Sequence, residues 1–222
     1  MKRFYPQLLF LSLFAAATGL FAGKAGAGTV NFDAAKAGEL PAGWLAKIAG
    51  PGNPKWTVEP EGSAPSRPHV LKQAGWTPKP SFPVCIQTNT ALKDGFVEVK
   101  FKPLSGTNDQ AAGLVWRFRD VENYYVARAN ALENNVVLYK VANGKRKALD
   151  IVGRTGDYGV KVEVPAREWS VLRINFAGPR FRVFLNGREL FAVDDTTFTA
   201  AGQVGVWTKA DSVTLFDDFQ YG

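Results

Sequence analysis

The chain has 222 residues, of which 46% are hydrophobic and 21% charged, and it contains one cysteine, Cys85, and one histidine, His69. This length and composition predict a globular protein of one or at most two domains with a sizeable core. One cysteine excludes an internal disulfide, and one histidine with one cysteine excludes a His-based metal cluster.

Residues 1–27 predict a secretory signal peptide. Lys2 and Arg3 give a basic start, the apolar run from Leu8 to Phe21 is short for a membrane span, and Ala25–Ala27 has the small residues of a cleavage site. We therefore expect a secreted or periplasmic protein without a membrane span after cleavage. An N-terminal anchor that stays uncleaved is the alternative.

Removal of this segment changes the charge of the chain. The segment carries Lys2, Arg3 and Lys24 and no acidic residue, so the formal net charge falls by three, from +7 to +4. No Lys/Arg-rich run follows, so a nucleic-acid partner is not expected. The short basic stretch Lys145–Lys147 favours a solvated hairpin tip, with a phosphate site as the alternative. We expect a monomer.

Residues 38–83 are rich in proline and glycine, which favours short strands joined by long loops. Strands are predicted at 56–59, 69–73 and 84–87. Cys85 lies in the apolar pattern of the third of these, so we interpret it as a buried, inert thiol and not as a nucleophile.

From Phe96 onward, apolar and polar residues alternate, as they do in half-buried strands. Asn143-Gly144 and Asn186-Gly187 are typical of two-residue hairpin turns. No stretch after the signal peptide repeats apolar residues at helical spacing. Inward-facing residues are predicted at Val97, Val99, Phe101, Leu114, Trp116, Phe118, Tyr125, Ala127, Ala129, Leu172, Ile174, Phe176, Phe181, Val183, Leu185, Val204 and Val206.

This pattern predicts an all-β protein built as an antiparallel two-sheet β-sandwich of the jelly-roll kind. Neither a linker nor an internal repeat interrupts it. We therefore expect a single domain over residues 28–222.

Three stretches carry a family resemblance: "AGLVWRFRDVENYYVARANALENNVVLYKV", "LRINFAGPRFRVFLNG" and the closing "GQVGVWTKADSVTLFDDF". In these stretches the chain resembles the concanavalin A-like lectin/glucanase superfamily, and more narrowly its bacterial laminin-G-like and 3-keto-disaccharide hydrolase group. The resemblance covers roughly residues 30–222. It implies the concanavalin A-like fold, whereas the superfamily holds lectins, glycosidases, lyases and adhesion modules.

A glycosidase needs two carboxyl groups about 5–9 Å apart. Family 16 glycanases of this superfamily carry them on one strand, in an alternating E-x-D-x-x-E run that this chain lacks. The pairs Asp194-Asp195 and Asp217-Asp218 are adjacent, so a strand would point their members to opposite faces. No catalytic residue is assigned, and any hydrolase or lyase would have to assemble its acids from separate strands or loops.

One carboxylate suggests a structural calcium ion, although no cofactor is required. Asp217 falls on the apolar side of the last predicted strand, and a buried carboxylate needs a partner. Asp33 in the first strand could lie beside it, and oxygen ligands suit Ca²⁺. The alternative is a carboxylate satisfied by backbone N–H groups or by an arginine.

Polar residues on the outward side of the central strands suggest a ligand-binding face. The resemblance implies that strands near 113–140 and 203–209 contribute to a concave sheet that carries ligands, and arginine, asparagine and glutamate offer fixed contacts to sugar hydroxyls beside a flat aromatic ring. The alternative is a charged, solvated sheet face. The predicted ligand-binding residues are Arg117, Arg128, Asn130, Glu133, Trp207 and Lys209.

Two functions follow from these observations, with a stand-alone structural domain of the periplasm as a third alternative. The first is an exported, non-catalytic carbohydrate-binding module with a glycan or other polar saccharide as ligand. The second is a glycoside-acting hydrolase or lyase, of the 3-keto-glycoside type in the resemblance. The absence of the paired-acid strand favours the module.

Overall fold

The computed structural model describes residue 1, residues 26–156 and residues 158–222. Most of the predicted signal peptide, residues 2–25, lies outside the described residues. Within the described ranges the chain forms sixteen strands, and no helix there is long and apolar enough to cross a membrane.

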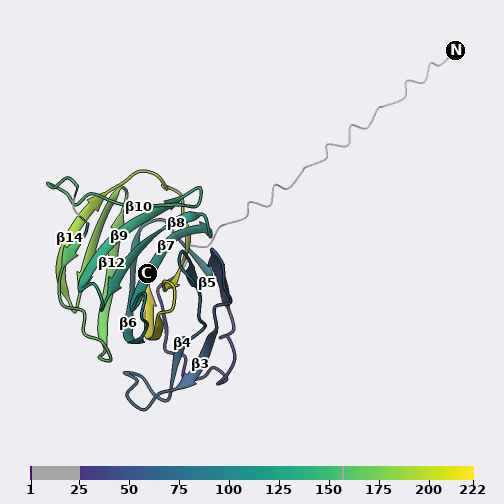
Figure 1. Ribbon diagram of the computed structural model, residues 1–222. Coiled ribbons are helices and arrows are strands. Elements are labelled where there is room, and N and C mark those ends of the chain that lie inside the picture. Colours follow the sequence, from purple (N-terminus) through teal and green to yellow (C-terminus); the bar gives the residue numbers. More distant parts are fainter. Residues whose placement is uncertain (2–25, 157) are drawn as a thin grey trace.

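The strands form two stacked antiparallel sheets, as predicted (Figure 1). Sheet A runs in the order β14 (Arg188–Asp194), β13 (Arg180–Leu185), β12 (Ser170–Ala177), β6 (Gly95–Ser105), β16 (Val213–Tyr221), β4 (His69–Gln73) and β3 (Trp56–Pro60), with β1 (Gly28–Val30) beside β16. Sheet B runs in the order β10 (Lys145–Ala148), β9 (Asn135–Ala142), β8 (Asn123–Asn130), β7 (Ala111–Asp120), β15 (Gly202–Trp207), β5 (Phe82–Leu92) and β2 (Trp44–Ala49), with β11 (Val160–Lys161) beside β9.

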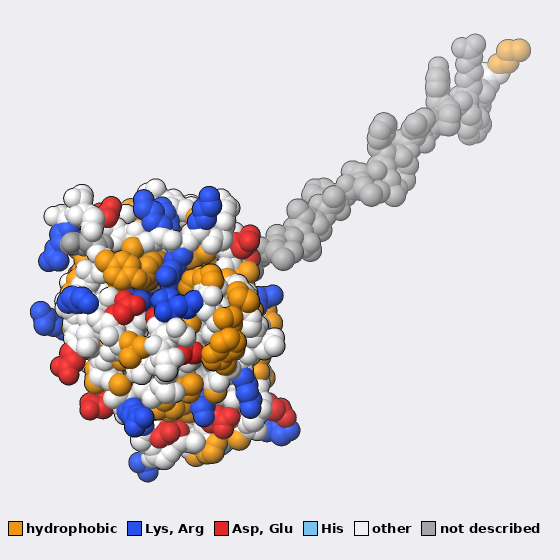
Figure 2. All heavy atoms as spheres, viewed as in Figure 1, with side chains coloured by type: hydrophobic (Ala, Val, Ile, Leu, Met, Phe, Trp, Pro, Cys, Tyr) orange, Lys and Arg blue, Asp and Glu red, His pale blue; other side chains and the backbone are white. Residues whose placement is uncertain are grey.

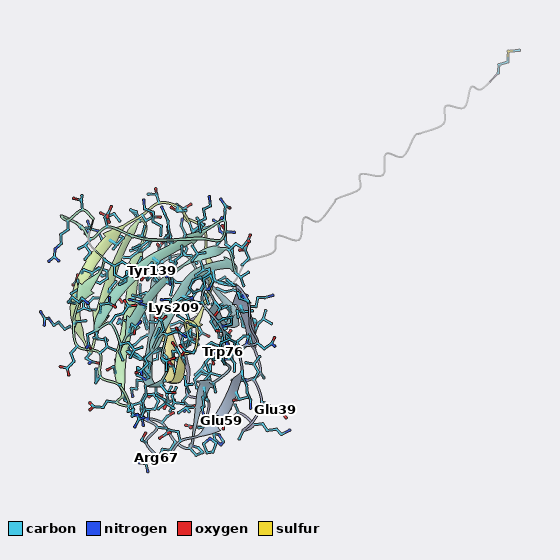
Figure 3. The ribbon with its side chains drawn as sticks, viewed as in Figure 1. Glu39, Glu59, Arg67, Trp76, Tyr139 and Lys209 are labelled. Carbon is cyan, nitrogen blue, oxygen red and sulfur yellow. The ribbon has the colours of Figure 1, made fainter. Side chains whose placement is uncertain are left out.

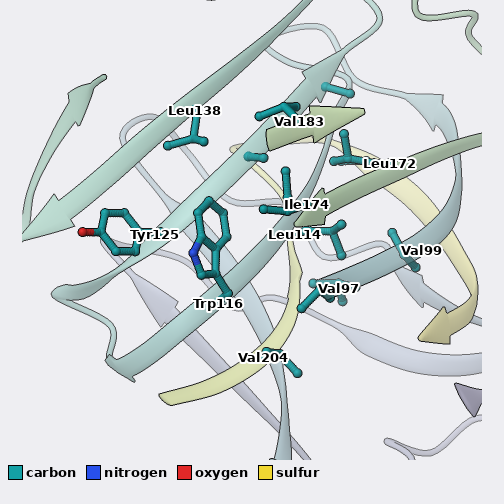
Figure 4. Packing of buried hydrophobic residues seen from close by; sticks show 14 of the residues in the cluster. Val97, Val99, Leu114, Trp116, Tyr125, Leu138, Leu172, Ile174, Val183 and Val204 are labelled. Carbon is teal, nitrogen blue, oxygen red and sulfur yellow. The ribbon is translucent and has the colours of Figure 1, made fainter. Parts of the chain in front are cut away.

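The core fills the space between the two sheets (Figure 4). Val97 and Val99 of β6 and Ile174 of β12 meet Leu114 and Trp116 of β7 there, and all five side chains are fully buried. Because side chains alternate along each strand, these residues lie on one face of their sheet. Burial of their apolar surface contributes roughly 25 cal/mol per Å² and stabilises the packing of the two sheets. The predicted inward positions are confirmed, with one exception in β7.

The exception is a β-bulge. The register of β7 against β8 shifts between Trp116 and Asp120, and Arg117 has a positive φ of 47°. A bulge inserts one residue and reverses the alternation after it. Phe118 was predicted to face inward, but it packs on the opposite face of sheet B against Tyr124. Gly202 makes room for this bulge, because a Cβ there would lie 2.5 Å from the Arg117 carbonyl carbon.

Arg117 was predicted to face outward and bind ligand, and this prediction is wrong. Its side chain is 1% exposed and enters the layer between the sheets, with Cζ 5.4 Å from the centre of the Phe181 ring. The guanidinium donates hydrogen bonds to the carbonyl oxygens of Lys93, Gly178 and Phe198. Arg117 therefore joins three loops and has no face toward a ligand.

Candidate functional site

The outer face of sheet B is concave. Arg146 of β10 lies with its Cζ 4.6 Å from the centre of the Phe82 ring, which begins β5. Four strands separate β10 from β5, so a flat sheet would hold them about 24 Å apart at 4.8 Å per strand. Two side chains cannot span that distance, so the sheet must curve toward its outer face.

A second apolar layer covers the floor of this concave face. Trp207 lies on the predicted face, but it is fully buried and stacks on Phe82 with ring centres 5.7 Å apart. Its Nε1 donates to the hydroxyl of Tyr124, and Gly113 below it leaves space for the indole, since a Cβ there would lie 3.1 Å from Cε3. The prediction that Trp207 contacts a ligand is therefore wrong, because Phe82 stacks on the ring and no part of the side chain is exposed.

Arg128 and Glu133 form the centre of a polar cluster on the same face. Arg128 is fully buried, and its Nη1 and Nη2 donate to the Glu133 carboxylate over 3.1 and 2.9 Å. Asn135 completes the arrangement, because it accepts from Arg128 over 2.6 Å and donates to Glu133 over 3.0 Å. The side chain of Glu133 remains 34% exposed, so its carboxylate faces solvent while Arg128 holds it from below.

Asn130 links this pair to a second carboxylate. Its Oδ1 accepts from the backbone N–H of Leu132, which shapes the β8–β9 turn. Its Nδ2 donates to Asp109 over 2.8 Å and to Glu133 over 3.3 Å, so the two acids share one donor. Lys209 neutralises Asp109, with Nζ 3.0 and 2.9 Å from the two carboxylate oxygens.

The loop that presents Asp109 is held by Asp211. The Asp211 carboxylate accepts hydrogen bonds from the backbone N–H groups of Thr107, Asn108 and Asp109. Burial alone would raise the pKa of Asp211, but these hydrogen bonds outweigh it and lower the pKa to about 2. Asp211 was not predicted, because a carboxylate over a hundred residues from its loop gives no local signal.

The electrostatics of the cluster favour a fixed negative charge on Glu133. Burial would raise the pKa of its carboxyl group, yet the hydrogen bonds and charge of Arg128, with Asn135 and Lys209, lower the pKa below its ordinary value. An acid held in the charged form accepts hydrogen bonds from hydroxyl groups. It is poorly suited to donating a proton to a leaving group.

Aromatic side chains flank the polar cluster on two sides. Tyr139 and Tyr158 are hydrogen-bonded through their hydroxyl groups, and Arg128 Cζ lies 5.7 and 5.8 Å from their ring centres. Trp76 is 68% exposed on a loop that the Thr77–Ala210 hydrogen bond ties to the segment carrying Lys209. Figure 3 marks Tyr139, Lys209 and Trp76 in this view, and Figure 2 shows hydrophobic side chains gathered around Lys and Arg on the same face.

The structure thus brings four of the six predicted ligand-binding residues together. Of these, Glu133 and Lys209 reach solvent, whereas Arg128 and Asn130 are fully buried and hold them in place. Sequence reasoning missed Asp109 and the exposed rings of Trp76 and Tyr158. The available signal for Trp76 was the presence of a tryptophan in a Pro/Gly-rich loop, "GWTPKP".

The two predicted calcium ligands accept hydrogen bonds from nearby residues of the chain, Asp217 from Ser66 and Asp33 from His69. Asp217 is fully buried and accepts from Ser66 N and Oγ over 2.8 and 2.7 Å and from the backbone N–H of Asp218 over 2.7 Å. Asp33 accepts from the backbone N–H of His69 over 3.1 Å. No group of three or more His, Cys, Asp or Glu residues is placed to hold a metal ion within the described residues.

The Asp217 carboxylate thus accepts hydrogen bonds from backbone N–H groups, as in the alternative stated above, and from the Ser66 hydroxyl, which that alternative did not include. Burial raises the pKa of Asp217 despite these hydrogen bonds. The calcium ion remains a prediction.

No family model matches the sequence, and no curated protein matches it. Solved structures with a similar fold include the carbohydrate-binding module CBM66 from Bacillus subtilis, with 20% identity, a TM-score of 0.61 and coverage of 80% of this chain and 93% of that one. A protein of unknown function with a galectin-like fold from Bacillus subtilis has 12% identity and a TM-score of 0.55, covering 80% and 88%. A β-glucanase from Bacillus licheniformis has 12% identity and a TM-score of 0.53, covering 88% and 97%.

At these identities the similarity establishes the fold alone. The fold is a jelly roll that agrees with the predicted concanavalin A-like superfamily. The narrower 3-keto-disaccharide hydrolase group is not shown by these matches.

Proposed function

We propose that the protein is an exported, non-catalytic module that binds a saccharide on the concave face of sheet B. The observation that carries the proposal is the fixed array of hydrogen-bonding groups around Glu133 and Lys209, flanked by the exposed rings of Tyr158 and Trp76. Sugars present hydroxyl groups at the ring edge and C–H groups on the ring face, so they match charged hydrogen-bonding partners beside aromatic platforms.

The rigidity of the cluster supports binding. Glu133 is held by Arg128, Asn130 and Asn135, so little side-chain freedom is lost when a hydroxyl group donates to its carboxylate. The similar solved structures include a carbohydrate-binding module and a β-glucanase, which correspond to binding and to catalysis.

Catalysis is the second candidate, because one specific observation favours it. Glu133 and Asp109 come from separate segments, and both carboxylates lie within 3.3 Å of Asn130 Nδ2. A glycosidase needs one acid that holds a proton at neutral pH. The hydrogen bonds and charge of Arg128 keep the pKa of Glu133 below its ordinary value, so Glu133 is a poor proton donor, and the Asp109 carboxylate is occupied by an ion pair with Lys209; we therefore favour binding.

Export by a signal peptide and membership of the 3-keto-disaccharide hydrolase group are further parts of the proposal, and each has its own test. The signal peptide at residues 1–27 would place the protein in the periplasm or outside the cell, which N-terminal sequencing of the exported protein would test. Membership of the 3-keto-disaccharide hydrolase group would predict activity on 3-keto-glycosides. Release of sugar by the wild type and its loss in Glu133→Gln and Asp109→Asn would support that alternative.

The deciding experiment measures saccharide binding by the purified protein on a glycan array and by calorimetry. We expect saturable binding that falls roughly two- to tenfold in each of Trp76→Ala and Tyr158→Ala, because the contact of one aromatic ring contributes about 0.5–1.5 kcal/mol. Phe184→Ala on sheet A is the matched control and should bind as the wild type does. Absence of binding to every glycan, or equal binding by all variants, would contradict the proposal.

A further inference from the structure

Arg146 is held between two aromatic rings on the concave face of sheet B. Its Cζ lies 4.6 Å from the centre of the Phe82 ring and 4.5 Å from that of Tyr139. The basic stretch that contains it was interpreted as a solvated hairpin tip, and for Arg146 this interpretation is wrong, because the side chain folds over the apolar layer. A stacked guanidinium keeps its N–H donors in the plane, directed away from the rings.

No carboxylate neutralises Arg146 among the described residues. Its Nη1 is buried and meets no hydrogen-bond acceptor there. Arg128 on the same face is paired with Glu133. Arg146 differs, because its guanidinium has no carboxylate partner among the described residues. An arginine with rings on two sides and no acid is a ready partner for an external anion.

The net charge around Arg146 also favours binding of an anion. Among the described residues, five cationic side chains contact the polar cluster or its rings and meet two carboxylates, Glu133 and Asp109, which leaves three positive charges in excess there. Even if Asp211 is counted, although its carboxylate is occupied by backbone N–H groups, the excess is two. The cationic residues are Lys79, Arg128, Arg146, Lys161 and Lys209.

We propose that this face selects saccharides that carry an anionic group, a carboxylate or a sulfate ester, and that Arg146 binds that group. The inference rests on the proposed function and names the class of its ligand. The geometry fits, because the guanidinium packs on Tyr139, the ring that also contacts Arg128 and the exposed Tyr158. A sugar ring near Tyr158 could therefore reach Glu133 with its hydroxyl groups and Arg146 with its acidic group.

The experiment compares matched pairs of polymers at about 150 mM salt, where screening limits non-specific attraction to roughly 8 Å. Polygalacturonate is compared with its methyl ester, and dextran sulfate with dextran. We expect binding of an acidic polymer and at least tenfold weaker binding of its neutral counterpart. The two pairs distinguish a carboxylate from a sulfate as the group recognised.

Variants connect this preference to Arg146. Arg146→Met keeps the packing between the rings and removes the charge, and we expect it to lose tenfold or more in affinity for the acidic polymer. Arg146→Gln is the second variant if thermal unfolding shows that the Met variant is not folded. Lys147→Gln is the matched control, since this exposed residue of the same strand points to the opposite face and carries the same charge.

The outcomes separate the two proposals. Equal binding of neutral and acidic polymers, unaffected in Arg146→Met, overturns the inference and leaves the saccharide-binding proposal standing. An equal loss in Lys147→Gln and Arg146→Met overturns the inference as well, because it shows attraction to net charge. If neither acidic polymer binds but the glycan array shows binding of a neutral saccharide, the inference alone fails; if no glycan binds in either experiment, both proposals fail.

Discussion

Replacement of Glu133 by alanine tests the central pair of the site. The change removes the two hydrogen bonds that Glu133 accepts from Arg128, over 3.1 and 2.9 Å, and leaves a guanidinium with 0% side-chain exposure. Among the described residues, the Arg128 guanidinium then keeps one hydrogen bond, to Asn135 Oδ1. A buried charge that loses its partner destabilises a protein strongly.

The expected magnitude follows from burial. Removal of one partner of a fully buried pair costs about 3–5 kcal/mol. Glu133 is 34% exposed, and solvent therefore already screens part of the interaction, so we expect a loss of about 2–3 kcal/mol in the free energy of unfolding. For a chain of this size that corresponds to a fall in Tm of roughly 4–12 °C.

The assay is urea and thermal unfolding of the wild type and the variant. Glu189→Ala is the matched control, because Glu189 pairs with Arg182, whose side chain is 52% exposed, and its loss should cost less than about 1 kcal/mol. The double variant Arg128→Leu/Glu133→Leu should be less destabilised than the sum of its single changes. A Glu133→Ala variant as stable as Glu189→Ala would refute the reasoning.

Four further predictions test other parts of the molecule. Arg117→Met should lower the free energy of unfolding by about 3 kcal/mol or more in urea titrations, because three loop carbonyl groups lose their donor; a loss below 1 kcal/mol would show that water replaces the guanidinium. The fold lowers the pKa of Asp211 from its ordinary value of 3.8 to about 2, so the stability that Asp211 contributes is complete above pH 3.8 and is lost as the pH falls through about 2. Asp211→Asn should therefore flatten the decline in Tm between pH 4 and pH 2. An unchanged pH profile of Tm would contradict this prediction. EDTA should lower the Tm of the wild type and leave Asp217→Asn unaffected if a calcium ion is bound, whereas no change in either would argue against the ion. Burial raises the pKa of the Cys85 thiol well above its ordinary value, so a thiol reagent should modify it only after unfolding, and fast labelling of the native protein would refute its burial.

At the β7 bulge, the alternation of apolar and polar residues no longer predicts which face of the sheet a side chain occupies. Period-two reasoning placed Trp116 correctly and then misplaced Arg117 and Phe118, because one inserted residue shifts every following side chain to the other face. The bulge depends on Gly202, which is distant in sequence and leaves room for the Arg117 backbone. A local pattern contains no information about that contact.

The candidate site was predicted in part for a similar reason. Arg128, Asn130 and Glu133 surround one short turn, so their proximity could be anticipated from spacing. Asp109 comes from another loop, and only the folded chain brings it to Asn130 and brings Asp211 to the backbone of that loop. Burial of Trp207 required knowledge of Phe82, over a hundred residues away, and of the curvature that lets Arg146 cover it.

The sequence by itself determined the all-β class, the hairpin turns and the residues that fill the space between the sheets, because strand periodicity and turn chemistry are local properties. Only the tertiary structure decided which outward residues reach solvent. The outer face of sheet B is concave, so side chains from opposite edges meet above its floor and bury part of it. The exposure of a side chain on a curved sheet depends on contacts between distant strands, and alternation along one strand does not predict those contacts.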